Sequence, residues 1–423
     1  MISRRRFLEL AGATGAAARH LFAAQANASS LPAPIAQLRS RNSEATPITI
    51  EERSQRQERA HQLMAENAMD AIVIMAGTTL RYFTGISWWG GERMFAFILP
   101  AKGPAFYVCP AFEEGRAREQ LRNAPDAVNA DVRVWQEDES PYQLLAHGLK
   151  DRGMASGKIG IEETVRFVFA DGIAKAAPQA VLTSATPVTA GCRMIKSPHE
   201  IALMRLASQV TLAVYQAVYQ SLREGMTQND VENLISAAYD RMGFPGDASI
   251  MVGESTASPH GSRAPQVIRQ GTIIMLDDGC EIEGYQSDIT RTFVLGKASD
   301  KMKSVFDIVH RAQSAALAAA RPGAECGSID AAARKVITDA GYGPGYKYFT
   351  HRLGHGLGMD GHEWPYLVLG NATKLQPGMT TSNEPGIYIQ GEFGIRLEDD
   401  MHITDNGAEI FTRQSPSLEQ PFA

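Results

Sequence analysis

Two aspartates stand inside a stretch of this 423-residue chain that otherwise alternates as β-strands do. Strands are expected over residues 273–280 and 285–295, and the four residues between them are expected to form the turn. If the hairpin is symmetric about the Ile282–Glu283 bond, Asp277 and Asp288 face each other with Cβ atoms about 5 Å apart. Two carboxylates at that distance repel each other, so a bound cation between them is the favoured explanation.

A second pair of acidic residues is predicted to meet in the same way nearer the C-terminus. Glu384 and Glu398 are equally far from Gly391, and apolar residues alternate on both sides of that glycine. A hairpin centred on Gly391 therefore places the two glutamates opposite each other. Between the two hairpins, three histidines lie among glycines: His351, His355 and His362. One imidazole with four carboxylates would suit Mn²⁺, Co²⁺ or Zn²⁺, with two ions sharing ligands.

The composition is that of an ordinary folded protein. The net charge is −6, 44% of the residues are hydrophobic and 21% are charged, and the chain is long enough for two domains with cores of their own. Dense lysine and arginine runs are confined to the first few residues, which argues against a nucleic-acid surface. Past residue 30, apolar runs fall short of the roughly 18 residues that span a membrane. The four cysteines are widely spaced, so a disulfide framework is not expected.

The first 28 residues have the pattern of an export signal. Ser3–Leu8 reads SRRRFL, which resembles the twin-arginine signal of bacteria, and an alanine-rich stretch leads to the A-x-A cleavage pattern at Ala26–Ala28. A basic N-terminal tail is the alternative, because Arg19 and His20 interrupt the apolar stretch. The export interpretation predicts a periplasmic or secreted protein whose mature chain begins near Ser29.

The rest of the chain is predicted to contain a linker and two domains. Residues 29–48 are expected to be an irregular linker. Residues 49–191 alternate between apolar strand-like runs and polar helical stretches, which predicts a smaller α/β domain. Residues 192–423 begin with long amphipathic helices and end in a strand-rich third. All the candidate metal ligands fall in this second domain.

Four motifs in the second domain resemble the metal-ligand motifs of the creatinase/aminopeptidase P/prolidase superfamily. They are D-x-G-x(8)-D-I-T-R-T from Asp277, G-H-G-L-G from Gly354, N-E-P-G-I-Y from Asn383 and G-I-R-L-E-D from Gly394. The resemblance implies an α+β pita-bread catalytic domain that follows the smaller α/β domain typical of creatinase N-termini. Within this superfamily, the chain most resembles bacterial Xaa-Pro dipeptidases.

The resemblance also implies roles for individual residues. Two divalent ions, manganese first and cobalt or zinc as alternatives, would be held by five side chains: Asp277, Asp288, His355, Glu384 and Glu398. Glu384 would also carry the proton from the attacking water to the leaving nitrogen. His260 and His362 would hold the scissile peptide and stabilise charge on its carbonyl oxygen, and Arg396 would fix a ligating carboxylate. The implied activity is metal-dependent hydrolysis of the Xaa-Pro bond in short peptides, by a homodimer.

Two further residues near the predicted ligands carry separate expectations. Asp278 stands where relatives often have an uncharged residue, and strand alternation predicts that it points away from the face of Asp277. His351 would lie one helical turn before His355 if that segment were helical, which makes it a candidate for the wall of the site.

Other functions remain open at the level of the sequence. A creatinase-like or ectoine-derivative-hydrolase-like enzyme that acts on a non-peptide amide would share the fold, but metal-free members typically lack some of the five ligands. A non-catalytic peptide-binding module is disfavoured for the same reason. A serine hydrolase is disfavoured because Pro259 and Gly261 oppose the helix that would follow Ser255. The sequence chooses neither the metal nor between dipeptides and longer peptides.

Overall fold

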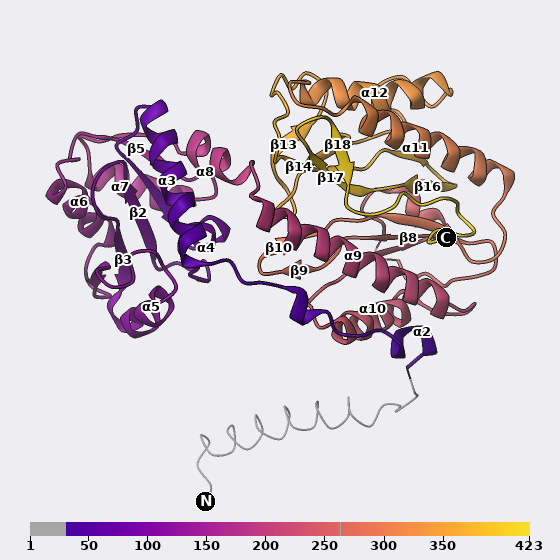
Figure 1. Cartoon of the computed structure of the whole chain (residues 1–423), viewed down its shortest axis with the longest axis horizontal. Helices are drawn as coiled ribbons and strands as arrows, with labels where there is room; N and C mark the ends of the chain where they lie inside the picture. Colours follow the sequence, from indigo (N-terminus) through magenta and orange to yellow (C-terminus); the bar gives the residue numbers. More distant parts are fainter. Residues whose placement is uncertain (1–30, 263) are drawn as a thin grey trace, which may run out of the picture.

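The computed structural model describes residues 31–262 and 264–423, so the predicted export signal at residues 1–28 lies outside the described residues. Figure 1 shows two units, an N-terminal one in indigo to magenta and a larger one that continues to the C-terminus. The predicted irregular linker contains two short helices, α2 (Ala33–Ala36) and η1 (Asn42–Glu44). Ile35 of α2 is buried, and α2 contacts α9 and α10 of the larger unit. The linker is therefore packed against the larger unit.

The N-terminal unit is a six-stranded sheet with helices, as the sequence pattern predicts. The strand order is β4-β3-β2-β1-β5-β6, in which β2 is antiparallel to both of its neighbours and the other pairs are parallel. All residues of β1, β2 and β3 are buried, so they form much of its core. The strands are β1 (Ala71–Met75), β2 (Ala96–Pro100), β3 (Phe106–Pro110), β4 (Asp131–Trp135), β5 (Lys158–Ile161) and β6 (Val181–Ser184). The helices are α3 (Ile50–Glu66), α4 (Thr78–Thr84), α5 (Glu114–Leu121), α6 (Pro141–Asp151), α7 (Phe167–Ala176) and α8 (Thr186–Arg193).

The larger unit has strands between two pairs of helices (Figure 1). One pair is α9 (Pro198–Ser221) and α10 (Gln228–Met242), and the other is α11 (Asp300–Ala319) and α12 (Cys326–Asp339). The strands form sheets of order β11-β8-β7, β13-β12-β14-β17-β18, β15-β16 and β10-β9. Their bounds are β7 (Ser249–Val252), β8 (Ile273–Asp277), β9 (Glu281–Ile282), β10 (Tyr285–Gln286), β11 (Arg291–Val294), β12 (Gly354–Gly356), β13 (Glu363–Leu367), β14 (Thr380–Asn383), β15 (Gly386–Ile389), β16 (Phe393–Arg396), β17 (Asp399–Ile403) and β18 (Ala408–Ile410).

The residues of β8 explain why helices cover both sides of the strands. Ile274 and Leu276 belong to the hydrophobic core that includes α9 and α10, whereas Ile273 belongs to the core that includes α11 and α12. Because successive side chains of a strand point to opposite faces, one apolar strand fills both cores. The predicted α+β arrangement of this unit is confirmed.

Capping side chains fix the starts of α9 and α10. The Ser197 hydroxyl accepts a hydrogen bond from Glu200 N, and the Glu200 carboxylate accepts one from Ser197 N at 2.6 Å. Thr227 and Asp230 form the same box at the start of α10, and Gly243 ends that helix with a φ of 84°. Helix α9 is long and apolar enough to cross a membrane by composition, but 61% of its most apolar stretch is buried in the fold, as in a core helix.

The C-terminal hairpin forms as the sequence predicts. β15 and β16 pair symmetrically about Gly391, with Ile387 opposite Ile395. Glu384 and Glu398 lie just beyond the paired ends of these strands. The period-two alternation of apolar residues therefore gave the correct register here.

The first hairpin pairs differently from the prediction. Leu276 pairs with Arg291, which moves the centre of the hairpin by one residue and leaves Asp277 and Asp288 out of direct opposition. The turn consists of Glu283–Gly284, whose φ angles are 53° and 94°, and a two-residue turn of this kind matches the twist of the strands. Because the shift changes each pairing by two positions, the two aspartates remain on one face as diagonal neighbours.

Candidate metal centre and active site

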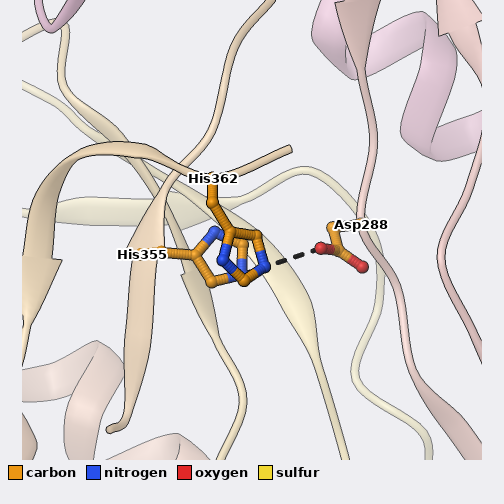
Figure 2. Close-up of side chains that lie close together, drawn as sticks. All are labelled: Asp288, His355 and His362. Atoms are coloured by element: carbon orange, nitrogen blue, oxygen red, sulfur yellow. Dashed lines mark ion pairs between the residues drawn. The ribbon is translucent and has the colours of Figure 1, made fainter. Parts of the chain in front are cut away.

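The five predicted metal ligands line one cavity of about 230 Å³ in the larger unit: Asp277, Asp288, His355, Glu384 and Glu398. Ligand atoms of His355, Glu384 and Glu398 lie within 4.8 Å of one another, and so do those of Asp277, Asp288 and Glu398. Glu398 belongs to both groups, and the five side chains together would hold two divalent ions. A third group consists of Asp288, His355 and His362. Figure 2 shows the rings of the two histidines one over the other.

The G-H-G sequence brings the histidine ligand into the cavity. His355 is the middle residue of β12, which lies between β13 and β14. A Cβ atom on Gly354 or on Gly356 would lie 2.2 Å from a carbonyl oxygen of a neighbouring strand. Only glycine fits at both positions without moving the backbone, so the two glycines let β12 pack closely enough to place the imidazole.

The four carboxylates come from places where strands end. Asp277 is the last residue of β8, Asp288 precedes β11, Glu384 follows β14, and Glu398 lies between β16 and β17. His355 Nε2 lies 3.3 Å from Glu384 Oε1 and 3.7 Å from Asp288 Oδ2. Segments next to two different sheets thus place carboxylates against a single imidazole.

The electrostatics of the cavity fit a bound divalent cation. Burial raises the pKa of Asp288 well above its usual range, and the nearby charge of Asp277 raises it further. Burial and the charge of Asp288 raise the pKa of Glu398 in the same way. Burial opposes the charged form of His355, yet the carboxylates of Glu384 and Asp288 raise its pKa to about 9. Buried carboxylates this crowded need a compensating charge, and an oxygen-rich set with one imidazole suits a divalent metal.

Arg396 holds the acidic side chains in place. Its Nη2 donates to Asp277 Oδ2, its Nε donates to Thr290 Oγ1 at 3.0 Å, and its Nη1 donates to the Tyr388 hydroxyl at 2.9 Å. Thr290 Oγ1 is also within hydrogen-bond distance of Asp277 Oδ1 and, at 2.6 Å, of Glu398 Oε2. The predicted role of Arg396, to fix a ligating carboxylate, agrees with these contacts. Thr290 was missed, although its place in D-I-T-R-T puts it on the same face as Asp288.

Replacing Arg396 by lysine is expected to weaken metal binding by about 10- to 100-fold, the usual cost of losing a group that orients a ligand. Lysine keeps the charge, but its single nitrogen cannot reach the three partners that Nε, Nη1 and Nη2 of the guanidinium contact. Titration of the stripped protein with Mn²⁺, followed by calorimetry, measures the effect. The exposed Arg269→Lys is the matched control. An Arg396→Lys variant that binds Mn²⁺ as tightly as the wild type would contradict this role.

Three further histidines lie on the wall of the same cavity: His260, His351 and His362. The His362 ring stacks on His355 with centroids 3.7 Å apart, and burial and the nearby positive charge lower the pKa of His362 to about 4. His362 is therefore neutral near pH 7. His351 lines the site as expected, but its segment is irregular rather than helical, and its Nε2 lies 2.8 Å from the Tyr388 hydroxyl.

Asp278 does not follow the alternation that was expected of it. Its φ of 100° breaks the strand after Asp277, and both residues line the same cavity. The Asp278 carboxylate accepts hydrogen bonds from Ser249 N at 2.9 Å and from Ser249 Oγ at 2.7 Å. It belongs to none of the three metal-ligating groups that the described residues form.

The segment that carries His362 is tied to the N-terminal unit, which sequence analysis missed. Asp360 accepts hydrogen bonds from Thr78 Oγ1 at 2.5 Å and from Arg193 Nη2 at 2.6 Å. The same Arg193 nitrogen donates to Glu363. Because these contacts hold residues on both sides of His362, the N-terminal unit helps to position that imidazole.

Comparison with known proteins identifies both units. Residues 202–405 match metallopeptidase family M24, and residues 56–195 match the creatinase/prolidase N-terminal domain. The predicted boundary at residue 192 falls inside α8 and just before the N-terminal match ends at residue 195, and it stays a prediction.

Individual relatives resemble the chain over almost their full length. An Xaa-Pro dipeptidase of Lactobacillus delbrueckii subsp. lactis is 32% identical over 84% of this chain and 96% of its own. The crystal structure of dipeptidase PepE from Mycobacterium ulcerans superposes with a TM-score of 0.82 at 31% identity, covering 88% of this chain and 99% of the other. A prolidase from Thermococcus sibiricus superposes with a TM-score of 0.76 at 31% identity, covering 87% and 98%. With the predicted pita-bread fold and accessory domain confirmed by these matches, the chain belongs to the M24 metallopeptidases, enzymes that use divalent metal ions.

Proposed function

We propose that this metallopeptidase hydrolyses the Xaa-Pro bond of dipeptides or short peptides, with two divalent ions, manganese first, held by the five ligands. The observation that carries the proposal is the pair of three-residue ligand groups that share Glu398 in one cavity. The names of the relatives, Xaa-Pro dipeptidase and prolidase, support the choice of substrate.

The residues around the cavity have separate roles in the proposed reaction. When bound, the metal ions lower the pKa of a coordinated water and so supply a nucleophile near neutral pH. Glu384 accepts the proton of that water and delivers it to the leaving nitrogen. His362 is neutral and lies against the ligand His355, so it is suited to donate a hydrogen bond to the scissile carbonyl oxygen, and His260 lines the same cavity. Arg396 keeps Asp277 oriented.

Export and assembly are also proposals. The twin-arginine pattern at Ser3–Leu8 and the A-x-A pattern at Ala26–Ala28 support export to the periplasm or beyond it. A homodimer is proposed from the resemblance to the superfamily. Fractionation of expressing cells and sedimentation of the purified protein test these two statements.

A substrate panel tests the proposed activity. The stripped protein would be assayed with Mn²⁺, Co²⁺ or Zn²⁺ on Xaa-Pro dipeptides, Xaa-Pro-Yaa tripeptides, creatine and acylated diamino acids. Turnover of Xaa-Pro compounds that disappears with a chelator and returns with metal is the expected result. Turnover of creatine or of an acylated diamino acid without any Xaa-Pro hydrolysis would replace the proposed substrate by a non-peptide amide.

A further inference from the structure

A second cavity, of about 460 Å³, lies beside the metal cavity and shares part of its wall. Asp278, Asp288 and His362 line both cavities, so the two adjoin at these side chains. Asp247 and Glu281 line the second cavity but not the metal cavity, so the second cavity extends away from the metal ligands. A substrate held at the ligands therefore has room on this side for one of its side chains.

The second cavity is negatively charged. It is lined by four acidic side chains, Asp247, Asp278, Glu281 and Asp288, and within residues 31–262 and 264–423 no lysine or arginine lines it. Bound divalent ions would offset the charge of the ligand Asp288, and Arg81 pairs with Glu281 at 2.8 Å. The carboxylates of Asp247 and Asp278 accept hydrogen bonds from described residues but are not paired with a cation among them. The cavity therefore favours a positively charged occupant.

Hydrogen bonds hold the Asp278 carboxylate at the junction of the two cavities. Its Oδ2 accepts from Ser249 N at 2.9 Å and from Ser249 Oγ at 2.7 Å, whereas its Oδ1 accepts from no residue that the structure describes. Asp278 also stands outside the three metal-ligating groups found in the described chain. The second oxygen is thus held in place and available to a cationic part of the substrate.

The side chain of the first substrate residue is the part that can reach this carboxylate. The α-ammonium group is attached to the carbon atom next to the scissile carbonyl, so it stays beside the metal ligands. The proline ring of the second residue carries no charge, so an acidic wall offers it no favourable interaction. Only the first side chain can both extend away from the ligands and carry a positive charge.

We propose that Asp278 binds the ammonium or guanidinium group of a basic first residue, and that it thereby makes the enzyme prefer Lys-Pro and Arg-Pro dipeptides. The inference rests on the proposed Xaa-Pro activity and names its substrate class. Lysine and arginine have long apolar stems that can lie along a cavity wall while the charged group meets the carboxylate. A hydrogen bond between two charged groups is roughly twice as strong as one between neutral groups, so the preference should be measurable.

The test compares Lys-Pro with norleucyl-proline, whose first side chain has the same carbon chain but lacks the ammonium group. The wild type is expected to prefer Lys-Pro by about 10-fold in kcat/KM, mainly through KM, as a hydrogen bond to a charged group predicts. Asp278→Asn should lose this preference, because asparagine keeps an oxygen for Ser249 and tolerates a positive φ but carries no charge. Asp240→Asn, at an exposed position of α10, is the matched control and should keep the preference.

Calorimetry of the metal-loaded protein gives a second readout. L-lysine, the first product of Lys-Pro hydrolysis, should bind to the wild type about 10-fold more tightly than L-norleucine. The two amino acids should bind equally to Asp278→Asn. Added salt should reduce the difference in the wild type, because screening weakens an interaction between charges.

The outcomes separate this inference from the proposed activity. Equal kcat/KM of the wild type on Lys-Pro and norleucyl-proline overturns the inference and leaves Xaa-Pro hydrolysis standing. A preference that Asp278→Asn retains, or an equal loss on both substrates in that variant, overturns the role of Asp278; an equal loss would assign it to the support of the metal site. Failure of the wild type on every Xaa-Pro compound overturns both. The comparison of the two dipeptides needs no variant, so it holds even if a substitution impairs folding.

Discussion

The variant Glu384→Gln is expected to hydrolyse an Xaa-Pro dipeptide with kcat lowered by roughly 10³-fold, inside the ~10²–10⁴-fold range of a positioned general base or acid. Burial alone would raise the pKa of Glu384, but the hydrogen bond with His355 and the charges of His351 and Arg396 lower it to about 2, so the side chain is ionised. Glutamine keeps the size and the contact with His355 but cannot accept a proton.

The experiment must separate loss of the proton carrier from loss of a metal ligand. Rates would be measured at saturating Mn²⁺, with the metal content of each sample determined by atomic absorption. Glu392→Gln is the matched control, because Glu392 lies on the turn of the same hairpin, is 44% exposed and pairs only with Lys301 among the residues described. A Glu384→Gln enzyme with full metal content and a kcat within threefold of the wild type would remove Glu384 from proton transfer.

The ligand set could be predicted because period-two alternation preserves the face of a strand. Glu384 and Glu398 fall at the ends of a hairpin whose register follows from its apolar residues. The register of the other hairpin was wrong, since it depends on Glu283, a residue other than glycine, adopting a positive φ. Asp277 and Asp288 still share a face, because the error was an even number of positions. The predicted ligands therefore still lie on one face, although the predicted pairing of individual residues was wrong.

Contacts between distant parts of the chain left no pattern in the sequence. Asp360 is held by Thr78, which is 282 positions away, and by Arg193, which is 167 positions away. Tyr366 lies under Arg352 because β13 folds back on β12, and a bare sequence does not show this pairing. The chemistry of the ligands was therefore accessible from residue types and spacing, whereas the groups that orient the ligands and the substrate required the fold.

Replacing Arg291 by methionine is expected to destabilise the protein by about 3–5 kcal/mol, the cost of removing one partner of a buried ion pair. Arg291 and Asp399 are both fully buried, and Arg291 Nη2 donates to Asp399 Oδ1 at 2.6 Å. Arg291 Nη1 also donates to the carbonyl oxygen of the ligand Glu398 at 2.7 Å. In the variant, the Asp399 carboxylate keeps only Gln313 and Thr412 as side-chain partners.

The pH dependence of that loss distinguishes an uncompensated charge from a packing defect. Burial raises the pKa of Asp399, and Arg291 opposes the rise, so removing Arg291 raises it further. A carboxyl whose folded pKa exceeds its unfolded value of about 3.9 binds more protons when folded, so stability falls as pH rises above about 4. Urea unfolding of the metal-loaded Arg291→Met variant should therefore show a larger loss in the free energy of unfolding, relative to the wild type, at pH 8 than at pH 5. The double variant Arg291→Met/Asp399→Asn should show a smaller difference between the two pH values. An equal loss in the free energy of unfolding at both pH values would mean that the methionine merely packs badly. The charge of Arg291 would then contribute little to compensating the buried Asp399 carboxylate.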